Sequence, residues 1–514
     1  MSSANANAMS GATRTAITVS TMLATLMQSL DTTIANIALP HVQASVSASS
    51  DQISWVLTSY IVAAAIMTPP SGFLAGRFGL KRVYLVSVAG FVCASMLCGV
   101  AQSLVQIVLF RILQGLCGAA LVPLSQAVLL SIYPPERRGA AMGVWGLAVM
   151  VGPILGPILG GWLTDSYSWR YVFYINLPVG ILAFLGLSAF LAERPRDAIA
   201  KLDWFGFSTL SIAIAAFQVL LDRGEQLDWL GSAEIVTEAI VAAGAFYLFI
   251  VHTLTAKAPF LNPRLLRDRN FLAGTLFNMI LGLTYYASLA LLPTYLQQLM
   301  HYPVVTAGLT LGPQGIGSMT AMLLAGKLVG RVDTRVMLAI GLGCAAFGFY
   351  ETTQWTPDVS QTTIMSIGVI QGASIGFLFV PLSVVALSTL PPELVANGSG
   401  FFNLARNIAS SAGISIVTSL VTQNTQANHA EIASHASAIN RMFENPVIAH
   451  LWNPLSAAGR AALDAVITQQ AQIIAYIDDY KLLMVATLAV VPLLIVFKKP
   501  PRSRATEQAG GAHL

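Results

Sequence analysis

Long apolar segments alternate with short polar connectors along almost the whole chain. A membrane-spanning helix needs about 20 consecutive, mainly apolar residues, and the 514-residue sequence holds fourteen segments of this kind. They cover approximately residues 15–38, 54–75, 82–102, 104–130, 139–161, 171–191, 204–221, 233–255, 271–297, 305–328, 335–352, 363–390, 395–421 and 477–497. The pattern predicts an all-α polytopic membrane protein with short loops and no large soluble domain.

The composition indicates the same class of protein. Hydrophobic residues make up 55% of the chain and charged residues only 10%, whereas a soluble domain carries about 25% charged residues. The cysteines at 93, 98, 117 and 344 fall inside expected spans. We therefore expect them to pack as small apolar residues, with no disulfide, metal or cofactor site. The first apolar segment is too long for a cleavable signal, and it contains Asp31.

The two halves of the chain repeat one another. Residues 114–136 (QGLCGAALVPLSQAVLLSIYPPE) and 371–393 (QGASIGFLFVPLSVVALSTLPPE) share the frame QG, VPLS, LS and PPE. Residues 72–82 (GFLAGRFGLKR) match residues 326–336 (GKLVGRVDTRV) at nearly the same offset. Collinear matches at one offset indicate a duplicated unit. With two extra spans between six-helix copies, the expected arrangement is 6+2+6.

The distribution of basic residues predicts the orientation. If the N-terminus is cytoplasmic, 20 of the 27 Lys and Arg residues fall inside and five outside, as the positive-inside rule requires. The net charge of +4 then reflects topology, and no nucleic-acid partner is needed to explain it. The expected parts are a cytoplasmic tail (1–14), a six-helix half (15–191), an inserted hairpin (204–255), a second half (271–497) with a long outer loop (422–476), and a cytoplasmic tail (498–514).

Two opposite charges interrupt the apolar spans of the first half. Asp31 lies nine residues from Pro40 and Arg111 lies seven residues from Leu104, which places them about 13 Å and 10 Å from the outer ends of their spans. At such similar depths they are expected to be neighbours, directly or through water. Charges inside a membrane usually serve function. Because a nearby arginine favours the ionised carboxylate and burial favours the neutral form, we expect Asp31 to exchange a proton; the alternative is a structural ion pair.

Glycine and proline recur in the fifth expected span. Glycines at every fourth residue allow close helix contacts, and the prolines remove backbone hydrogen bonds and bend the helix. We expect a bent, closely packed seam there, and the alternative is a simple kink. Its residues are Gly152, Pro153, Gly156, Pro157, Gly160 and Gly161.

These motifs resemble those of the major facilitator superfamily. Residues 72–82 are similar to its loop motif between helices two and three, Arg111 with Gln114 to its helix-four motif, and residues 152–161 to its helix-five antiporter motif. The loop residues expected to act in gating are Gly72, Arg77, Gly79, Lys81 and Arg82. This loop departs from the family pattern, because Gly76 stands where an acidic residue is usual and Leu80 where an arginine is usual.

Other motifs resemble the fourteen-helix drug:proton antiporters of this superfamily. LDTTIANIALP (30–40) is similar to their first-helix signature, and WRYVFYINLPVG (169–180) and LDRGEQLDW (221–229) are similar to EmrB-type members. The resemblance implies a non-enzymatic, proton-coupled antiporter of the bacterial inner membrane that exports lipophilic or amphiphilic compounds from the lipid bilayer. It also implies an EmrA-type periplasmic adaptor and a TolC-type outer-membrane channel. Loop 422–476, with helical stretches expected near 454–475, is a candidate docking surface for the adaptor, and the alternative is an irregular linker.

The substrate cavity is expected between the two halves. An arginine there suits anionic or zwitterionic amphiphiles, and its alternative role is to brace a helix contact. The candidate cavity residues are Asn36, Gln114, Asn278, Tyr285, Tyr286, Asn403 and Arg406.

Other classes of protein fit the sequence less well. The phosphate-binding loop that an ATP-driven pump requires is not found in the sequence. The G-x-S-x-G pattern at 372–376 lies inside a span, where the strand-to-helix turn of a hydrolase is not expected. The remaining alternative lies within transport: a dedicated exporter, or a proton-coupled importer, of one metabolite or fatty acid.

Overall fold

The computed structural model describes residues 10–193, 202–257, 259–391, 393–435, 452 and 456–497. The far ends of the expected tails (1–9 and 498–514), the connector 194–201 and the middle of the expected outer loop (436–451 and 453–455) lie outside the described residues. Within the described part every regular element is a helix, which agrees with the expected all-α class.

The first half consists of helices joined by short turns. Side-chain caps begin several of them: Ser10 accepts a hydrogen bond from the backbone of Thr13, and Ser103 accepts one from Gln106. Gly79 separates two helices with a φ of 99°, a conformation that glycine adopts readily. The elements are α2 (Gly11–Val46), α3 (Ser50–Ile53), α4 (Trp55–Met67), α5 (Ser71–Phe78), α6 (Leu80–Val100), α7 (Leu104–Gly118), α8 (Leu121–Ile132), α9 (Pro135–Ser166), α10 (Tyr171–Tyr174) and α11 (Asn176–Phe190).

The rest of the chain is built in the same way. Asp203 caps the hairpin helix that follows it, and Asp268 caps the helix that opens the second half. The hairpin contains α12 (Trp204–Arg223), η1 (Trp229–Gly231) and α13 (Ala233–Thr255). The second half contains α14 (Pro263–Arg267), α15 (Arg269–Thr294), the π-helical turn η2 (Tyr295–Leu299), α16 (Val304–Leu328), α17 (Thr334–Thr352), α18 (Gln361–Ser388), α19 (Val395–His435), α21 (Ala457–Leu488) and η4 (Val491–Ile495).

The described helices include nine that are long and apolar enough to cross a membrane, or ten if α4 and α5, which meet at 54°, form one span. Four further long helices, α2, α16, α17 and α21, do not reach this level of hydropathy. In α2 the reason is its many Thr, Ser, Asn and Gln residues. A count from length and hydropathy alone is therefore smaller than the fourteen expected segments.

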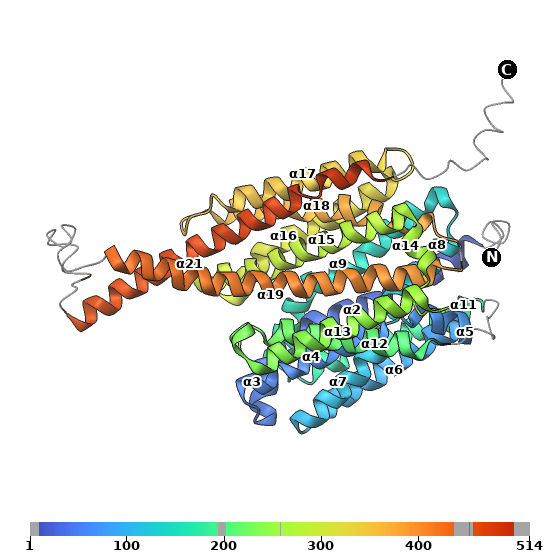
Figure 1. Cartoon of the computed structure of the whole chain (residues 1–514), viewed down its shortest axis with the longest axis horizontal. Helices are drawn as coiled ribbons and strands as arrows, with labels where there is room; N and C mark the ends of the chain where they lie inside the picture. Colours follow the sequence, from blue (N-terminus) through green and yellow to red (C-terminus); the bar gives the residue numbers. More distant parts are fainter. Residues whose placement is uncertain are drawn as a thin grey trace, which may run out of the picture.

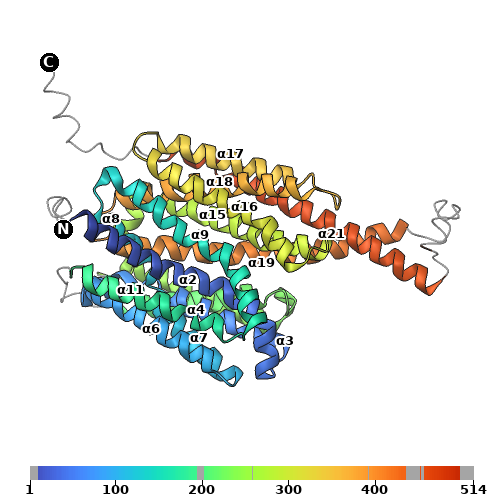
Figure 2. The same ribbon diagram turned by 180° about the vertical axis from the view of Figure 1, so that it is seen from behind.

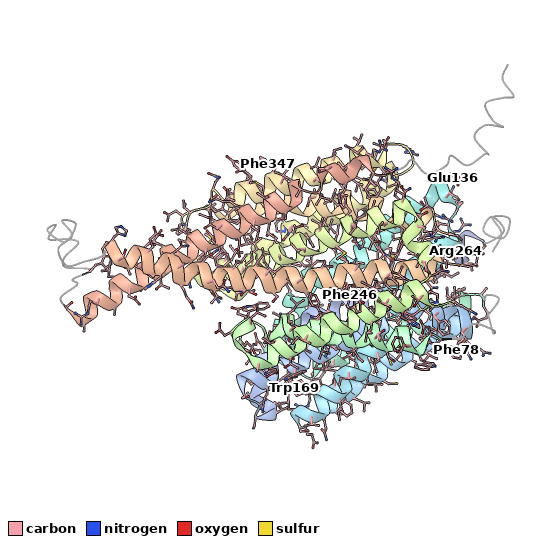
Figure 3. The ribbon with its side chains drawn as sticks, in the orientation of Figure 1. Phe78, Glu136, Trp169, Phe246, Arg264 and Phe347 are labelled. Carbon is pink, nitrogen blue, oxygen red and sulfur yellow. The ribbon has the colours of Figure 1, made fainter. Side chains whose placement is uncertain are left out.

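The helices form an elongated bundle with two distinct ends (Figure 1). Phe78, Glu136 and Arg264 lie at one end and Trp169 lies at the opposite one (Figure 3). We call the first the basic end, because the turns there hold Arg77, Lys81, Arg82, Arg137 and Arg138. We call the opposite one the distal end.

The two halves touch closely at the basic end. A methyl group on Gly72 would lie 2.5 Å from the backbone nitrogen of Asn397, and one on Gly143 would lie 2.6 Å from the carbonyl oxygen of Met322. Gly326 is similarly close to the backbone of Gly139. Glycine at these positions lets helices of different halves meet backbone to backbone, so this end of the bundle is closed.

The α12–α13 hairpin lies along the junction of the halves. Asp222 of α12 accepts a hydrogen bond from Thr58 of α4, while Gln218 donates to Ser411 of α19 at 2.7 Å. At its basic end Asp203 joins α12 to α13 through His252, at 2.9 Å. Burial acts to raise the pKa of Asp203, but hydrogen bonds from the backbone of Gly206 and Phe260 and from His252 outweigh it, and the pKa is lowered.

Two helices continue beyond the bundle at the distal end. Figures 1 and 2 show α19 and α21 projecting side by side from it. The expected long loop is therefore helical over its described margins, as α19 up to His435 and as α21 from Ala457. His429 and Asp464 join the two projections at 3.0 Å. The polar segment from residue 422 continues α19 as far as His435, because a segment rich in Ala and Gln still forms helix where a neighbouring helix packs along it.

Candidate functional site

A fully buried ion pair lies inside the first half. Asp31 of α2 and Arg111 of α7 are both 0% exposed, and Nη1 of Arg111 lies 2.6 Å from Oδ2 of Asp31. The structure thus brings together the two charges that the sequence places at similar depth. Removing two such ions from water costs several kcal/mol each, so their remaining hydrogen-bonding groups need partners.

Neutral groups from three other positions supply partners. Gln114 accepts a hydrogen bond from Arg111 Nη1 at 2.8 Å and donates one to Asp31 Oδ1 at 2.8 Å. Asn176 of α11 donates to Asp31 Oδ1 at 3.1 Å and to Ser95 of α6 at 2.9 Å. The carbonyl of Val56 in α4 accepts from Arg111 Nε at 3.1 Å.

Aromatic rings close the site around the guanidinium group. The Cζ atom of Arg111 lies 4.2 Å from the centre of the Tyr60 ring and 5.7 Å from that of Phe173. Contacts of this kind stabilise a desolvated cation. The two carboxyl oxygens of Asp31 receive hydrogen bonds from three donors, on Arg111, Gln114 and Asn176.

Sequence reasoning identified three of the polar members and missed the others. Asn176 stands in the segment 169–180, to which we assigned no site residue. A lone amide inside an apolar span is the signal that points to it. The roles of Val56 and Tyr60 carry no such signal, because one acts through its backbone and the other resembles any aromatic residue in a span.

The Gly/Pro run of α9 forms a seam with α2. Proline lacks an N–H, so Pro153 leaves the carbonyl of Val149 without its helical donor, and Ser29 Oγ donates to that carbonyl at 2.6 Å. Thr33 Oγ1 likewise donates to the carbonyl of Gly152 at 3.0 Å. The run remains helical as far as Ser166.

Three of the four glycines of this run explain the closeness of the seam. Added methyl groups at Gly152, Gly156 and Gly160 would meet Ser29, Thr33 and Ile34 of α2 respectively, whereas one at Gly161 would meet nothing within 4 Å. Asp31 lies between the two hydroxyl residues in the sequence, so the seam and the ion pair share one stretch of α2.

Polar residues also connect the two halves close to the glycine contacts of the basic end. Gln126 of α8 accepts hydrogen bonds from Ser399 Oγ at 2.6 Å and from Asn403 Nδ2 at 2.7 Å. Asn278 donates to the carbonyl of Phe402 at 2.8 Å. Asn403 thus lies in the contact between the halves, and Asn278 links α15 to α19.

Arg406 is the second buried arginine, and its surroundings differ from those of Arg111. It is 6% exposed, and its Cζ atom lies 5.3 Å from the centre of the Phe379 ring. Phe379 in turn stacks on Trp145 of the first half, with ring centres 5.8 Å apart. Nε and Nη1 of Arg406 are buried without a hydrogen-bond partner among the described residues.

The other candidate cavity residues are spread out. Tyr285 is 9% exposed, packs edge-on against Tyr286 at 5.5 Å, and its hydroxyl approaches Met150 Sδ at 3.8 Å. With Phe277, Thr284, Ser374 and other residues it lines a small, mainly apolar cavity inside the second half. Asn36 is exposed on α2 and does not join the buried site.

The charged side chains of the candidate gating loop make contacts within the first half. Lys81 donates to the carbonyl of Ser188 at 2.7 Å, and Arg82 lies 4.0 Å from Glu193. Arg77 lies over the ring of its neighbour Phe78. Gly72 lies in close contact with Asn397 of the second half. A methyl group at Gly76 would meet nothing within 4 Å. The first carbon of the acidic side chain that is usual at this position in the family would therefore have room. The described residues hold no cluster of metal-binding side chains.

Comparisons with known proteins agree with this geometry. A family model described as the Major Facilitator Superfamily matches residues 21–414. The chain is 34% identical to the multidrug export protein EmrB of Haemophilus influenzae over 94% of this chain and 96% of that protein. It is 34% identical to the fatty acid resistance protein FarB of Neisseria gonorrhoeae over 98% and 99%, and 35% identical to EmrB of Escherichia coli K12 over 98% and 98%.

Solved structures share the fold at much lower identity. The human organic anion transporter MFSD10 matches with a TM-score of 0.57 and 14% identity, over 92% of this chain and 98% of that one. The proton:xylose symporter XylE matches with a TM-score of 0.56 and 14% identity, over 92% and 97%.

Replacing Asp31 alone is expected to destabilise the folded protein. Asp31→Asn leaves the buried guanidinium of Arg111 without a counter-charge, which typically costs about 3–5 kcal/mol. Thermal unfolding of the detergent-solubilised protein should therefore begin at a clearly lower temperature. Adding Arg111→Gln should recover much of this loss, because no unpaired charge then remains. Single and double variants whose losses simply add would contradict the pairing.

Proposed function

This chain belongs to the major facilitator superfamily, a family of membrane transporters and not of enzymes, and we propose that it is a proton-coupled antiporter that exports lipophilic or amphiphilic compounds by alternating access. The observation that carries the proposal is the buried Asp31–Arg111 pair. It is an ionisable site inside the bundle, next to the seam between α2 and α9. The printed names of the EmrB relatives support the direction of transport.

We propose fourteen spans in the arrangement 6+2+6, in the cell (inner) membrane. The nine or ten apolar helices, together with α2, α16, α17 and α21, support this number. The position of α12 between α4 and α19 supports an inserted hairpin, 204–255, between the halves 15–191 and 271–497. The basic end faces the cytoplasm with both termini, which the excess of Lys and Arg supports.

In the proposed cycle, protons reach Asp31 from the outer side. Protonation removes the carboxylate charge, weakens the contact with Arg111, and lets α2 move with α9 relative to the second half. Inside, substrate binding favours release of the proton, and the loaded carrier turns outward again. Proton entry drives export, because each elementary charge is worth about 2.3 kcal/mol per 100 mV of membrane potential.

The glycine contacts at the basic end support an arrangement that is closed toward the cytoplasm. Gly72, Gly143 and Gly326 allow the halves to meet there. In the proposed cycle these contacts open when the halves rock and re-form when the carrier faces outward. Of the expected gating residues, Gly72 lies at this contact, whereas Lys81 and Arg82 fix α6 to the first half.

The surroundings of Arg406 support the proposal that the substrates carry a negative charge. A buried cation whose nitrogen atoms lack partners is costly, and an anionic head group would satisfy it. The stacked rings of Phe379 and Trp145 offer an apolar surface beside it. That one relative is named a fatty acid resistance protein agrees with this class. The alternative is a dedicated exporter, or a proton-coupled importer, of one metabolite or fatty acid.

The projecting parts of α19 and α21 are the proposed docking surface for an EmrA-type periplasmic adaptor, which would hand the cargo to a TolC-type outer-membrane channel. Their length beyond the bundle and the His429–Asp464 contact support a defined helical arm at this position. The full-length similarity to EmrB proteins supports the kind of partner.

Transport with an imposed pH gradient tests the proposed coupling. In proteoliposomes that contain a pH-sensitive dye, we expect tetraphenylphosphonium or an anilinonaphthalene sulfonate to drive proton movement through the wild-type protein. Asp31→Asn should reduce it by at least about tenfold, equivalent to 1.4 kcal/mol, because the proton site is lost. Asp165→Asn, at an exposed carboxylate (77% exposed), is the control. Equal rates in the wild type and Asp31→Asn would show that Asp31 is structural only.

Substitution of Arg406 tests the substrate class. Arg406→Gln should lower transport of the anionic sulfonate by roughly tenfold or more, since a hydrogen-bonded charge contributes about 1.5–3 kcal/mol. Transport of the tetraphenylphosphonium cation should stay close to the wild-type rate. Arg406→Lys, which keeps the charge, should retain part of the sulfonate transport. An equal loss for cation and anion would assign Arg406 to helix packing instead.

Shortening the arm tests the adaptor surface. Replacing residues 424–468 by a short glycine-serine linker should leave transport in proteoliposomes intact, because the site lies within the bundle. The same variant should lose co-purification with the adaptor and fail to protect cells from toxic compounds. Full protection of cells by the shortened protein would contradict a docking role.

A further inference from the structure

A second buried carboxyl group lies in the second half, far along the chain from Asp31. Asp479 of α21 is 1% exposed, and its Oδ2 atom is buried without a hydrogen-bond partner among the described residues. It stands in the sequence IDDYK, which reads as the polar margin of the last expected span. Its burial is visible only once α21 packs against α15, α17 and α19.

The nearby cation pairs with a different carboxylate. Lys481 donates to Asp478 at 3.0 Å, and both side chains are about half exposed, at 56% and 44%. No ion pair to Asp479 is found in the described part of the chain, and Asp478 is the charged group whose field reaches it. Two adjacent carboxyl groups thus have opposite environments, one paired at the surface and one buried without a cation.

Two tyrosines lie beside Asp479 on its own helix, and one of them packs against further aromatic residues. Tyr476 and Tyr480, on its own helix, are 4% and 1% exposed and interact with it electrostatically. Tyr295 of η2 packs edge-on against Tyr476, with ring centres 5.5 Å apart, and Trp355 lies 6.1 Å from Tyr295. Apart from Asp478 and Lys481, the titratable groups that face Asp479 are therefore phenols.

Two polar atoms of the aromatic residues share the condition of Asp479. The hydroxyl of Tyr295 and Nε1 of Trp355 are buried and have no hydrogen-bond partner within the described residues, although buried polar groups in proteins are almost always paired. Internal waters would satisfy such atoms. The hydroxyls of Ser288 and Tyr480 are also buried, and they lie close enough to interact with each other.

Charge and burial determine which form of Asp479 this arrangement favours. An ionised carboxylate without a cation in such surroundings costs several kcal/mol, whereas a carboxylic acid both donates and accepts hydrogen bonds. The neutral acid is therefore the stable form while the aromatic residues cover it. Water that reached the cluster would stabilise the carboxylate and release the proton.

The backbone beside the cluster has an unusual form. Tyr295 begins the π-helical turn η2 (Tyr295–Leu299), which follows directly on α15, and π-turns inside helices often occur at functional sites. The same helix α15 meets Arg406 further along, where a methyl group on Gly282 would lie 2.7 Å from the Arg406 carbonyl oxygen. A shift of the turn would change both the contact of Tyr295 with Tyr476 and the contact of α15 with α19.

We propose that Asp479 is a second proton-binding site, separate from Asp31, which holds a proton beneath the Tyr295–Tyr476 contact and exchanges it at the distal end when the η2 turn shifts. No bond other than that of the proton changes: the carboxyl O–H breaks, and the proton passes to water. Protonation of Asp479 follows from its surroundings alone, whereas its part in export rests on the proposed antiport.

Infrared spectroscopy tests protonation without transport. A carboxylic acid has a carbonyl stretch distinct from that of a carboxylate, and it shifts in heavy water. We expect the wild-type protein at neutral pH to show a protonated carboxyl band that Asp479→Asn removes and Asp478→Asn retains. Asp479→Glu should restore a band at a shifted position, provided that both variants elute as folded protein. An unchanged band in Asp479→Asn overturns the proposal.

The proton count per substrate tests the role in transport. From the membrane potential at which net flux stops in proteoliposomes, Asp479→Asn should carry about one proton fewer per substrate than the wild type, and Asp478→Asn the wild-type number. An unchanged count overturns the role in export. If the wild type moves no protons at all, the proposed antiport fails, while the infrared band still decides whether Asp479 binds a proton.

Discussion

The ion pair between Asp31 and Arg111 is the contact on which the first half depends. Two charges inside a bundle of apolar helices are tolerated only when their charges and hydrogen bonds are matched, and the partners here come from α2, α4, α7 and α11. Each of these helices is therefore held at a fixed depth and rotation. The seam with α9 begins on the same stretch of α2, where Ser29 and Thr33 satisfy carbonyls of α9. The charge of one carboxyl group thus bears on the packing of most of this half.

Each half contains a buried arginine, and the surroundings of the two arginines differ. Arg111 donates to a carboxylate, an amide and a backbone carbonyl, whereas Arg406 has an aromatic ring beside it and two nitrogen atoms without partners. Among the described residues, Arg111 has a counter-charge and leaves only Nη2 without a partner, whereas Arg406 has no carboxylate within ion-pair distance and leaves two nitrogen atoms without a partner. The two buried arginines therefore have different electrostatic surroundings, one beside a carboxylate and one beside an aromatic ring. Arg406 packs on Phe379, and Phe379 stacks on Trp145 of the first half, so these three side chains connect the two halves.

Much of the architecture could be predicted from the sequence, because apolar length and internal repetition are local properties. The positions of Asp31 and Arg111 also followed from counting residues along two helices. The sequence could not reveal which neutral groups complete their network, since Asn176 and Val56 reach it only through tertiary packing. Asp479 was missed for a related reason: its neighbour Asp478 is a surface residue, and only the packing of α21 separates the two. The sequence also could not show that α19 continues as helix to His435 beyond the polar change near residue 422, because low hydropathy marks the end of a span and not the end of a helix.

The length of α19 has a mechanical consequence. Its 41 residues extend about 60 Å at 1.5 Å per residue, from the glycine contacts at the basic end, past Arg406, to the tip beyond the bundle. A rigid rod held near one end amplifies a small rotation into a large displacement at the other. A tilt of only about ten degrees, with the pivot at the basic end, would move the tip by roughly 10 Å over this length. A small change in the packing around Arg406, which α19 carries, would therefore appear as a much larger displacement of the described end of this helix at His435.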